Sequence, residues 1–496
     1  MEMSVHDMLK KMIQAKFYFT RIAVLLGILC FGVDRLPAQE ILIQPYLQPG
    51  NGTTLEGHDV KVVAWMTDSR QGEFCVEYGL KGSPFKMVQP MPVLLRIGDS
   101  KRYLLYRATL EPLPFDSVVE YRVTQSGQTM RESSFRTRAS RNEPIKFVML
   151  GDGGEETPEP RKIVYQMSRL NPDFGITLGD VVYTDGRLGQ YLHHYVNYYI
   201  NTAKASPDDG APIMASVPFY QVIGNHDVKG MNLGEYDDGM AFFYLWHPPL
   251  NGPKNVSVMP GVAGSPAAVE AFKMAAGAND PLARNYSFDN GPAHFLMLDA
   301  NAYVNVADPT WRSWIEKDLM ATKAKWKFVC FHQPGIHSSI YHYEEQRMRA
   351  FAPLFEKCGV DMVFSGHVHN YERTKPLRFV PSENLEKMAI SLMTGRKSTV
   401  PGTFTLDELF DGERHTVPKG VIYIVSGAGG RKLADPELTD HPELWKRDPA
   451  TWAPYTVKFV ADRHSFTEVV ANSQEVVLRQ IDLDGNEVDK IRITKP

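Results

Sequence analysis

Six short apolar runs, each followed at once by a glycine or a polar cluster, constrain the fold of this chain most. Strands that are buried on both faces of a sheet read as continuous apolar runs of this kind. Stretches with helical periodicity, at residues 158–170, 309–323 and 345–357, alternate with the runs and predict an α/β region. The runs occupy residues 145–150, 174–178, 219–223, 294–298, 328–331 and 360–364.

The preceding segment, residues 39–140, has a different texture and predicts a small all-β sandwich. Its short strands are expected at residues 60–66, 74–78, 103–110, 118–123 and 134–137, with turn residues between them. Residues 110–114 leading to Tyr121 resemble the tyrosine corner of fibronectin type III-like or immunoglobulin-like domains, where a Tyr hydroxyl bonds to upstream backbone. A Tyr in an ordinary β-core would give the same pattern.

The rest of the chain, residues 144–496, is interpreted as one domain that ends in a β segment at 455–496. Strands are expected there at residues 466–470, 475–480 and 490–494, with a hairpin turn at Asp484 and Gly485. Residues 228–284 and 374–418 are rich in Gly, Pro and Asp and are expected to be loops or insertions near the site.

The N-terminus predicts an export signal. Four basic residues between Lys10 and Arg21 precede an apolar run at residues 22–33, and a small residue, Ala38, follows. A run of about 12 residues is shorter than the roughly 20 that a membrane-spanning helix needs. We therefore expect residues 1–38 to be a signal peptide, with no stable membrane span after its removal and an extracytoplasmic (periplasmic or secreted) protein. An uncleaved anchor or a buried helix is the alternative.

Charge and cysteine content exclude two classes. Lys and Arg number 54 against 58 Asp and Glu, so the formal charge is −4, which disfavours a nucleic-acid binder. The four cysteines have no Cys-x-x-Cys spacing and predict neither a disulfide scaffold nor a cysteine zinc site.

The polar residues after the apolar runs are the types that bind metals. Alone, each is usually a turn, a helix cap or an ordinary histidine. Together they follow five separate strands, and the ends of strands are where α/β proteins place their sites. The five clusters are Gly151-Asp152-Gly153, Gly179-Asp180 with Tyr183, Gly224-Asn225-His226-Asp227, Val329 to His332, and Gly366-His367-Val368-His369.

These five ordered clusters closely resemble the purple acid phosphatases, within the calcineurin-like metallophosphoesterases. The resemblance implies an αββα catalytic domain behind a fibronectin type III-like domain. It also implies Asp152, Asp180, Tyr183 and His369 around one metal ion and Asp180, Asn225, His332 and His367 around a second. Carboxylate and phenolate suit Fe(III), and imidazole and amide suit a divalent ion, which would be Fe, Zn or Mn.

The resemblance further implies a reaction. Two metals would generate a hydroxide nucleophile from bound water. His226 is the leading candidate for protonating the leaving group, and Asp185 is the candidate for orienting His226. His342 matches a second histidine of the family pattern, and Glu345 completes a His-x-x-Glu pair; the resemblance implies that both are catalytic residues. A tyrosinate on Fe(III) would make the protein violet.

Other histidines receive weaker interpretations. His193 and His194 lie in an aromatic-rich stretch and are expected on a helix at the domain edge rather than on a metal. His337 is close to the site in sequence, without a matching role.

The sequence therefore predicts an exported dinuclear acid phosphatase that hydrolyses small phosphomonoesters. A phosphodiesterase or nucleotide hydrolase with the same centre is one alternative. A binding or adhesion protein with a vestigial metal site is another, although every ligand position is filled. The oligomeric state is not predicted.

Overall fold

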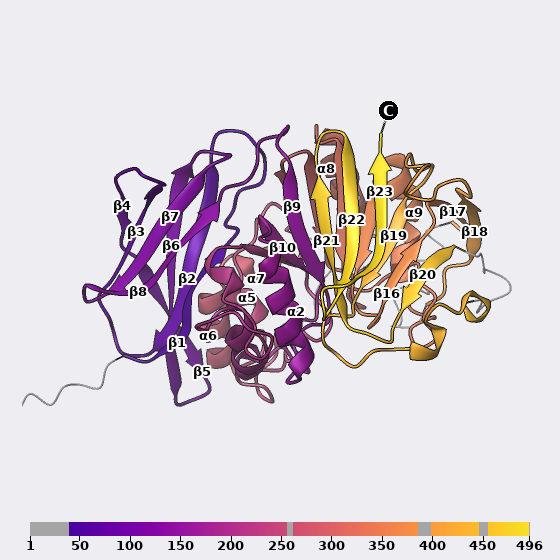
Figure 1. The fold of residues 1–496 in the computed structure, drawn as a ribbon. Coiled ribbons are helices and arrows are strands. Elements are labelled where there is room, and N and C mark those ends of the chain that lie inside the picture. The colour runs from indigo at the N-terminus through magenta and orange to yellow at the C-terminus, as the bar shows by residue number, and fades with distance from the viewer. Residues whose placement is uncertain (1–38, 255–260, 385–397, 446–454, 496) are drawn as a thin grey trace, which may run out of the picture. The chain divides into compact units, whose positions relative to one another are not determined.

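The structure, a computed structural model, describes residues 39–254, 261–384, 398–445 and 455–495. From Ile41 onward the chain forms one compact unit (Figure 1). The predicted signal segment lies outside the described residues, as do residues 255–260 and 385–397 of the two predicted loops. None of the helices in the described ranges has the length and apolar character needed to cross a bilayer.

The N-terminal region is a β-sandwich of two four-stranded antiparallel sheets, as the sequence predicts. The sheets have the orders β1-β2-β6-β5 and β4-β3-β7-β8. Trp65 and Tyr106 stack in the core, with ring centroids 5.1 Å apart. The strands are β1 (Ile41–Gln48), β2 (Asp59–Asp68), β3 (Phe74–Leu80), β4 (Lys86–Val88), β5 (Met91–Ile97), β6 (Lys101–Leu113), β7 (Val118–Gln125) and β8 (Gln128–Arg136). All five predicted strands lie within or overlap these.

The predicted tyrosine corner at Tyr121 is wrong. Its hydroxyl donates to the carbonyl of Ala215, at 2.7 Å, rather than to upstream backbone. The segment around Ala215 packs on the sandwich and brings its carbonyl within reach of the ring. It is Tyr78, on β3, that bonds the chain near the predicted corner, donating to the carbonyl of Glu111 at 2.7 Å.

One sheet of the second region combines segments from both ends of the chain. Strands β9, β10 and β11 are parallel, and the C-terminal β21 pairs antiparallel with β9, aligning Thr467 with Met149. Figure 1 shows β21, β22 and β23 continuing this sheet. The order is β11 (Phe219–Gln221), β10 (Phe174–Thr177), β9 (Ile145–Leu150), β21 (Ser465–Ala471), β22 (Glu475–Asp482), β23 (Glu487–Thr494). The predicted turn at Asp484 and Gly485 joins β22 to β23.

A second sheet of seven strands faces the first. Its strands β13, β14, β15 and β19 run parallel, and β12, β16 and β20 are antiparallel to their neighbours. The order is β12 (Tyr286–Asn290), β13 (Ala293–Leu298), β14 (Trp326–Phe331), β15 (Met362–Ser365), β19 (Ile422–Ser426), β16 (Tyr371–Thr374), β20 (Thr456–Val460).

Burial of both faces of these sheets explains the continuous apolar runs. On β9, Phe147 and Met149 enter the core between the sheets, whereas Val148 and Leu150 pack in a second core with Ile163 of α2 (Pro158–Arg169). The seven-stranded sheet likewise has a separate outer core against α8 (Pro309–Ala321) and α9 (Ala352–Lys357). The predicted αββα architecture is confirmed.

Two of the three predicted helices are α2 and α8, and the third begins later than predicted. Residues Arg347–Phe351 form the 3-10 helix η3, and the α-helix α9 starts only at Ala352. Pro353 favours this start because proline suits the first turn of a helix, where its missing N–H is not needed. Glu345 and Gln346 consequently lie outside the helix.

Short elements complete the described fold. His193 and His194 lie on the π-helix η1 (Leu192–Val196), consistent with the predicted helix. The predicted loops contain some regular structure. The elements are α3 (Leu188–Tyr191), α4 (Asn197–Tyr199), η2 (Ile213–Ala215), α5 (Phe242–Leu245), α6 (Pro266–Ala276), α7 (Asn279–Leu282), β17 (Leu377–Pro381), β18 (Gly402–Leu406), η4 (Pro436–Leu438) and η5 (Pro442–Leu444).

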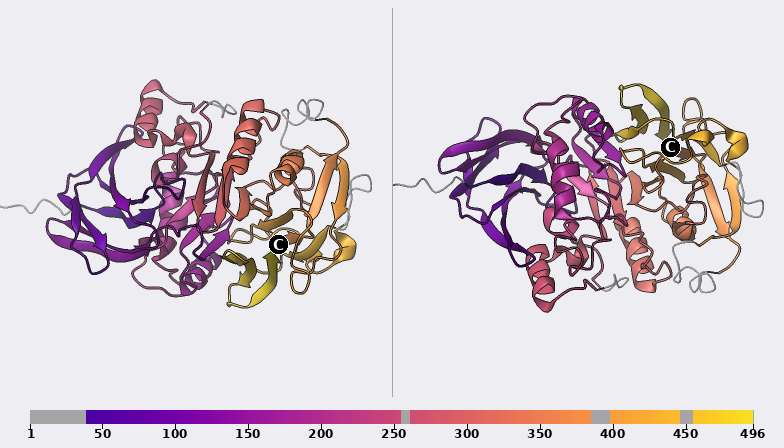
Figure 2. Two further views of the ribbon diagram at one scale, coloured as in Figure 1. Left: turned by 90° about the horizontal axis from the view of Figure 1, so that it is seen from above. Right: turned by 90° about the horizontal axis from the view of Figure 1, so that it is seen from below.

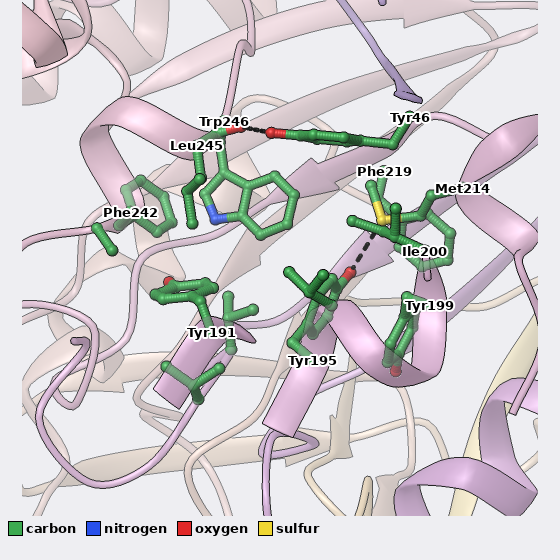
Figure 3. Close-up of a cluster of buried hydrophobic side chains, with 14 of the residues drawn as sticks. Tyr46, Tyr191, Tyr195, Tyr199, Ile200, Met214, Phe219, Phe242, Leu245 and Trp246 are labelled. Atoms are coloured by element: carbon green, nitrogen blue, oxygen red, sulfur yellow. Dashed lines mark hydrogen bonds between the residues drawn. The ribbon is translucent and has the colours of Figure 1, made fainter. Parts of the chain in front are cut away.

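An aromatic core joins the sandwich to the six-stranded sheet's outer layer (Figure 3). Tyr46 of β1 reaches across and donates its hydroxyl to the carbonyl of Leu245, at 2.7 Å. The neighbouring Trp246 packs edge-on against Tyr46, Tyr191 and Tyr195. In both views of Figure 2 the indigo strands of the sandwich accordingly lie against the magenta segment. The sandwich thus supports the layer that carries the loops of the site.

Candidate metal centre

The five predicted clusters all follow strands whose ends meet. Asp152 follows β9, Asp180 and Tyr183 follow β10, and Asn225 follows β11, which are adjacent parallel strands. His332 follows β14, and His367 and His369 follow β15, in the facing sheet. Carboxyl ends of parallel strands lie at one edge, so the chain brings these side chains together.

One group of donors surrounds the hydroxyl of Tyr183. This oxygen lies 2.7 Å from Oδ1 of Asp152 and 3.2 Å from Nε2 of His369. The same Asp152 oxygen lies 3.6 Å from His369 Nε2. Asp152 and Tyr183 are buried, so their oxygen atoms have little access to water.

A second group surrounds His332. Its Nε2 lies 3.2 Å from Oδ2 of Asp180 and 3.3 Å from Nδ1 of His367, and the ligand atoms of these three buried residues lie within 4.8 Å of one another. His332 Nε2 is also 4.0 Å from Oδ1 of Asp152, which links the two groups. Carboxylate, phenol and imidazole donors that converge in this way fit metal cations.

The backbone explains the glycines of the clusters. Gly179 has φ +88°, and a Cβ there would lie 2.5 Å from Nδ1 of His332. A Cβ on Gly224 would overlap Asp180. The adjoining Asp152, Asp180 and His367 themselves have φ values of 61°, 47° and 67°, which are uncommon for non-glycine residues. These tight turns aim the ligands into one small volume.

Each predicted histidine ligand is anchored through the nitrogen that faces away from the cluster. Nδ1 of His332 donates to the carbonyl of Leu178, at 2.7 Å, and Nδ1 of His369 donates to that of Lys432, at 2.8 Å. A carbonyl can only accept, so in the neutral form of each ring the proton is on Nδ1 and Nε2 can bind a metal. His367 is reversed, because its Nε2 lies 2.8 Å from Oε2 of Glu345 and its Nδ1 faces His332. Anchors of this kind fix ring orientation in metal sites.

Asp227 holds the loops of the acidic ligands, a role that the sequence did not reveal. Its Oδ1 accepts hydrogen bonds from the backbone N–H of Val181, at 3.1 Å, and from the hydroxyl of Tyr191, at 3.0 Å. Its Oδ2 accepts from the N–H of Gly224, at 2.8 Å. Asp227 is fully buried, and it joins the loops after β10 and β11 to the aromatic core. Its place in the Asn-His-Asp cluster was the available signal.

The predicted catalytic pair of His226 and Asp185 has an indirect connection. Nδ1 of His226 donates to the carbonyl of Thr184, at 2.5 Å, and its Nε2 lies 3.9 Å from Oδ2 of Asp180. Asp185 instead accepts from the Thr184 hydroxyl, at 2.6 Å, and pairs with Lys229, at 3.2 Å. Asp185 therefore braces the residue that holds His226.

His342 and Glu345 lie on the other side of the cluster. Nδ1 of His342 is 3.2 Å from Oε1 of Glu345, and its ring centroid is 4.4 Å from that of His367. Asn225 lies beside Gln333, whose Nε2 donates to Asn225 Oδ1 at 3.3 Å. Gln333 was not singled out from the sequence. His337 is buried, and neither of its ring nitrogens has a hydrogen-bond partner within the described residues.

Burial and charge shift the pKa values of these groups. Burial lowers the pKa of His367 to about 3 and that of His369 to about 4, so both rings are neutral at pH 7 and able to bind a cation. Burial, together with the charge of Asp180, raises the pKa of Asp152 to about 7. Burial opposes ionisation of Asp180, but the neighbouring His332 holds the pKa of Asp180 low. A cation between these groups would favour the ionised carboxylates.

Comparison with known proteins agrees with the family resemblance of the five clusters. Residues 145–371 match the calcineurin-like phosphoesterase family. This match covers the strands that carry the five clusters, so residues 145–371 form a calcineurin-like metallophosphoesterase domain. The chain is also similar to purple acid phosphatases, the family that the five clusters resemble.

Two curated relatives come from Arabidopsis thaliana. Fe(3+)-Zn(2+) purple acid phosphatase 12 is 23% identical over 352 residues, 68% of this chain, and purple acid phosphatase 18 is 26% identical over 336 residues, 65% of this chain. The matches span 65% of the length of each relative. The solved purple acid phosphatase from yellow lupin (Lupinus luteus) seeds has the same fold, with a TM-score of 0.60, 17% identity, and coverage of 91% of this chain and 74% of that chain.

Proposed function

We propose that this protein is a dinuclear metal-dependent acid phosphatase that hydrolyses phosphomonoesters. The observation that carries the proposal is the convergence of the ligand atoms of Asp180, His332 and His367 within 4.8 Å, joined through Asp152 to Tyr183 and His369. The relationship to purple acid phosphatases supports the same reaction.

Two sets of residues would hold the metals. Asp152, Tyr183 and His369 suit Fe(III), while Asn225, His332 and His367 suit a divalent Fe, Zn or Mn ion, and Asp180 would bridge them. The name of the Arabidopsis relative specifies Fe(III) and Zn(II) for that protein. When bound, the two ions would polarise the phosphoryl oxygens and lower the pKa of a water molecule.

Protein side chains supply the remaining chemistry. His226 is partly exposed, and Nδ1 donates to Thr184, which leaves Nε2 on the side of Asp180. A proton on Nε2 would pass to the leaving alcohol oxygen. His342, held by Glu345, is the second candidate to touch the ester. Small phosphomonoesters are therefore the proposed substrates.

The test is metal content and turnover of p-nitrophenyl phosphate, measured on the same purified sample. Two metal ions per chain together with turnover support the proposal. A sample with no bound metal and no turnover would favour a binding or adhesion protein. A panel of monoesters, diesters and pyrophosphates across pH separates it from a phosphodiesterase or nucleotide hydrolase.

A second test concerns His226. His226→Ala should keep both metals and lose roughly 10²- to 10⁴-fold in turnover, the usual range for a general acid. The loss should be smaller for p-nitrophenyl phosphate than for an alkyl phosphate, since p-nitrophenolate needs no proton to leave. Equal losses would favour a role in positioning phosphate.

We also propose export to an extracytoplasmic compartment, supported by the basic and apolar segments within residues 1–38. We also propose a division into a fibronectin type III-like domain at residues 39–140 and a catalytic domain at 144–496. The two four-stranded antiparallel sheets of the first region support this division.

A further inference from the structure

A cavity of about 190 Å³ opens beside the candidate metal centre. Its wall includes Asn225, a predicted metal ligand, and Glu345, the partner of His342 and His367. Val228, two residues after His226, also lines it. The two segments that carry the candidate proton donors thus both border this cavity. A leaving oxygen must lie within hydrogen-bond reach of its proton donor. The carbon chain attached to that oxygen would therefore extend into this space.

The size of the cavity restricts what enters. It holds the equivalent of about six water molecules at roughly 30 Å³ each. Pockets for drug-sized ligands begin at about 300 Å³. A short alcohol of a few non-hydrogen atoms fits within this volume, whereas a nucleoside would extend beyond it.

The lining is partly apolar and partly polar. Val228, Met231 and Met348 contribute apolar surface, and Gln333, Asn301 and Tyr303 contribute polar groups. The guanidinium of Arg347 is directed to backbone, since it donates to the carbonyls of Asn301 and Val304. Mixed linings of this kind bind organic groups through apolar contact and orient them through a few hydrogen bonds.

The side-chain amide of Gln333, a residue that lines the cavity, has an acceptor oxygen without a partner among the described residues. The surrounding hydrogen bonds fix the orientation of this amide. Oδ1 of Asp299 accepts from both the backbone N–H and Nδ2 of Asn301, each at 3.0 Å. Oδ1 of Asn301 therefore faces Gln333, which donates Nε2 to it at 3.0 Å. Oε1 of Gln333 is consequently the free end of the amide. It is buried and accepts no hydrogen bond from the described residues.

We propose that this cavity binds the leaving alcohol of the ester and that Gln333 selects alcohols that carry a second hydrogen-bond donor. The substrate class is phosphate monoesters of short polyols or amino alcohols. The inference rests on the proposed phosphatase function and specifies its substrate. Gln333 would accept the hydroxyl or amine adjacent to the ester carbon, since a buried acceptor left unpaired destabilises the complex.

The test compares 2-hydroxyethyl phosphate with ethyl phosphate, which differ by one hydroxyl. Wild-type protein should favour the hydroxylated ester by about 5- to 10-fold in kcat/KM, the effect of one hydrogen bond. Gln333→Met, which retains the length of the side chain, should bring the ratio close to one. Because both esters carry the same phosphate, any change in metal binding through Asn225 affects both rates and cancels in the ratio.

A second pair of variants tests the location. Ala302 lines the cavity and is exposed, so Ala302→Leu should narrow the cavity without disturbing the core. It should lower kcat/KM for 2-hydroxyethyl phosphate several-fold relative to methyl phosphate, which is too short to fill the space. Ala205→Leu, at an exposed position outside the cavity, is the matched control and should leave both rates unchanged.

The outcomes separate the two proposals. A wild-type protein that hydrolyses methyl phosphate with no preference for the hydroxyl, or whose preference survives Gln333→Met, overturns the role of Gln333 and leaves the phosphatase function intact. A preference for large nucleotide esters that Ala302→Leu does not change overturns the cavity assignment. A protein that holds metals and hydrolyses no monoester refutes both.

Discussion

Oε2 of Glu345 lies 2.8 Å from Nε2 of His367, and the second oxygen of the same carboxylate lies 3.2 Å from Nδ1 of His342. One acid therefore fixes the orientation of a predicted metal ligand and of a candidate proton donor. The position of Glu345 outside the helix α9 makes this possible, because a loop residue can turn its side chain towards the cluster.

Glu345→Gln is expected to weaken metal binding. The neutral amide still fills the space but no longer offers His367 a charged acceptor. Loss of such a partner costs about 10- to 100-fold in metal affinity, which titration of metal-depleted protein with a divalent ion would measure. Glu344→Gln, on the exposed neighbour, is the control. Unchanged affinity in Glu345→Gln would show that the contact does not serve the metal.

Asp180→Asn is expected to abolish binding of two metals. Asp180 is the predicted bridge, and its Oδ2 faces His332 at 3.2 Å while its Oδ1 accepts from the backbone N–H of His226 at 2.8 Å. Without this anion the mutual repulsion of two cations is less well opposed. Elemental analysis should find one metal or fewer per chain. Two metals with wild-type turnover would refute the bridging assignment.

Tyr183→Phe is expected to remove the visible absorption of the iron-loaded protein. The substitution keeps the ring beneath Arg431, whose guanidinium carbon is 4.7 Å from the ring centroid, and deletes only the oxygen donor. Hydrolysis should persist in part through the other ligands. Absorption spectra of the wild type and the variant after mild oxidation provide the measurement. A wild-type protein with two divalent ions, no iron and no band would argue against a ferric centre.

Asp227→Asn is expected to destabilise the fold by roughly 3 kcal/mol, since the loss of one member of a buried polar network has this order of cost. An amide in this place offers one acceptor oxygen to the N–H groups of Val181 and Gly224, which now use two. Urea unfolding would measure the loss. The exposed Asp237→Asn should change stability little. A stable Asp227→Asn protein would mean that the loops after β10 and β11 are held by other contacts.

His294 predicts a pH dependence of stability far from the metal centre. Its Nδ1 lies 2.7 Å from Asp289 and its Nε2 lies 2.9 Å from Asp318. Burial opposes the charged ring, but the two carboxylates outweigh it and raise the pKa of His294 from 6.5 to about 9. A raised pKa stabilises the fold fully below pH 6.5, and this contribution is lost as the pH rises through 9.

The measurement compares the free energy of unfolding of the wild type with that of His294→Gln across this window. At about 1.4 kcal/mol for each pH unit, the advantage of the wild type should shrink by roughly 3 kcal/mol. A difference that stays constant with pH would show that the ring is neutral in the fold.

The sequence predicted the architecture where burial leaves a local signature. Runs such as residues 145–150 are apolar throughout because one set of side chains faces the opposite sheet and the other faces a helix. The pairing of β21 with β9 has no such signature, because the sequence of an apolar strand does not specify which neighbouring strand it pairs with. The hydroxyl of Tyr121 likewise found an acceptor, Ala215, that only the packing of two distant segments provides.

The site shows the same division. The clusters that end strands identified the side chains that meet, since strand polarity alone sends them to one edge. The supports were hidden, because the bonds of Asp227 to Val181 and of Glu345 to His367 depend on loop conformation. The cavity beside Gln333 is built from three separate loops, and none of them carries a motif for it.

The distribution of the predicted ligands between the two sheets has a further consequence. The strand ends of one sheet supply every acidic, phenolic and amide ligand, and those of the other supply every imidazole. Neither sheet alone supplies both kinds of predicted ligand, so the cluster exists only at the separation that the hydrophobic core between the two sheets imposes. Phe147 and Phe295, whose rings meet edge-on in that core at 5.2 Å, thereby act as a spacer for the chemistry above them. A change in their size would alter the gap between acids and histidines, and so metal preference would depend on residues that never touch a metal.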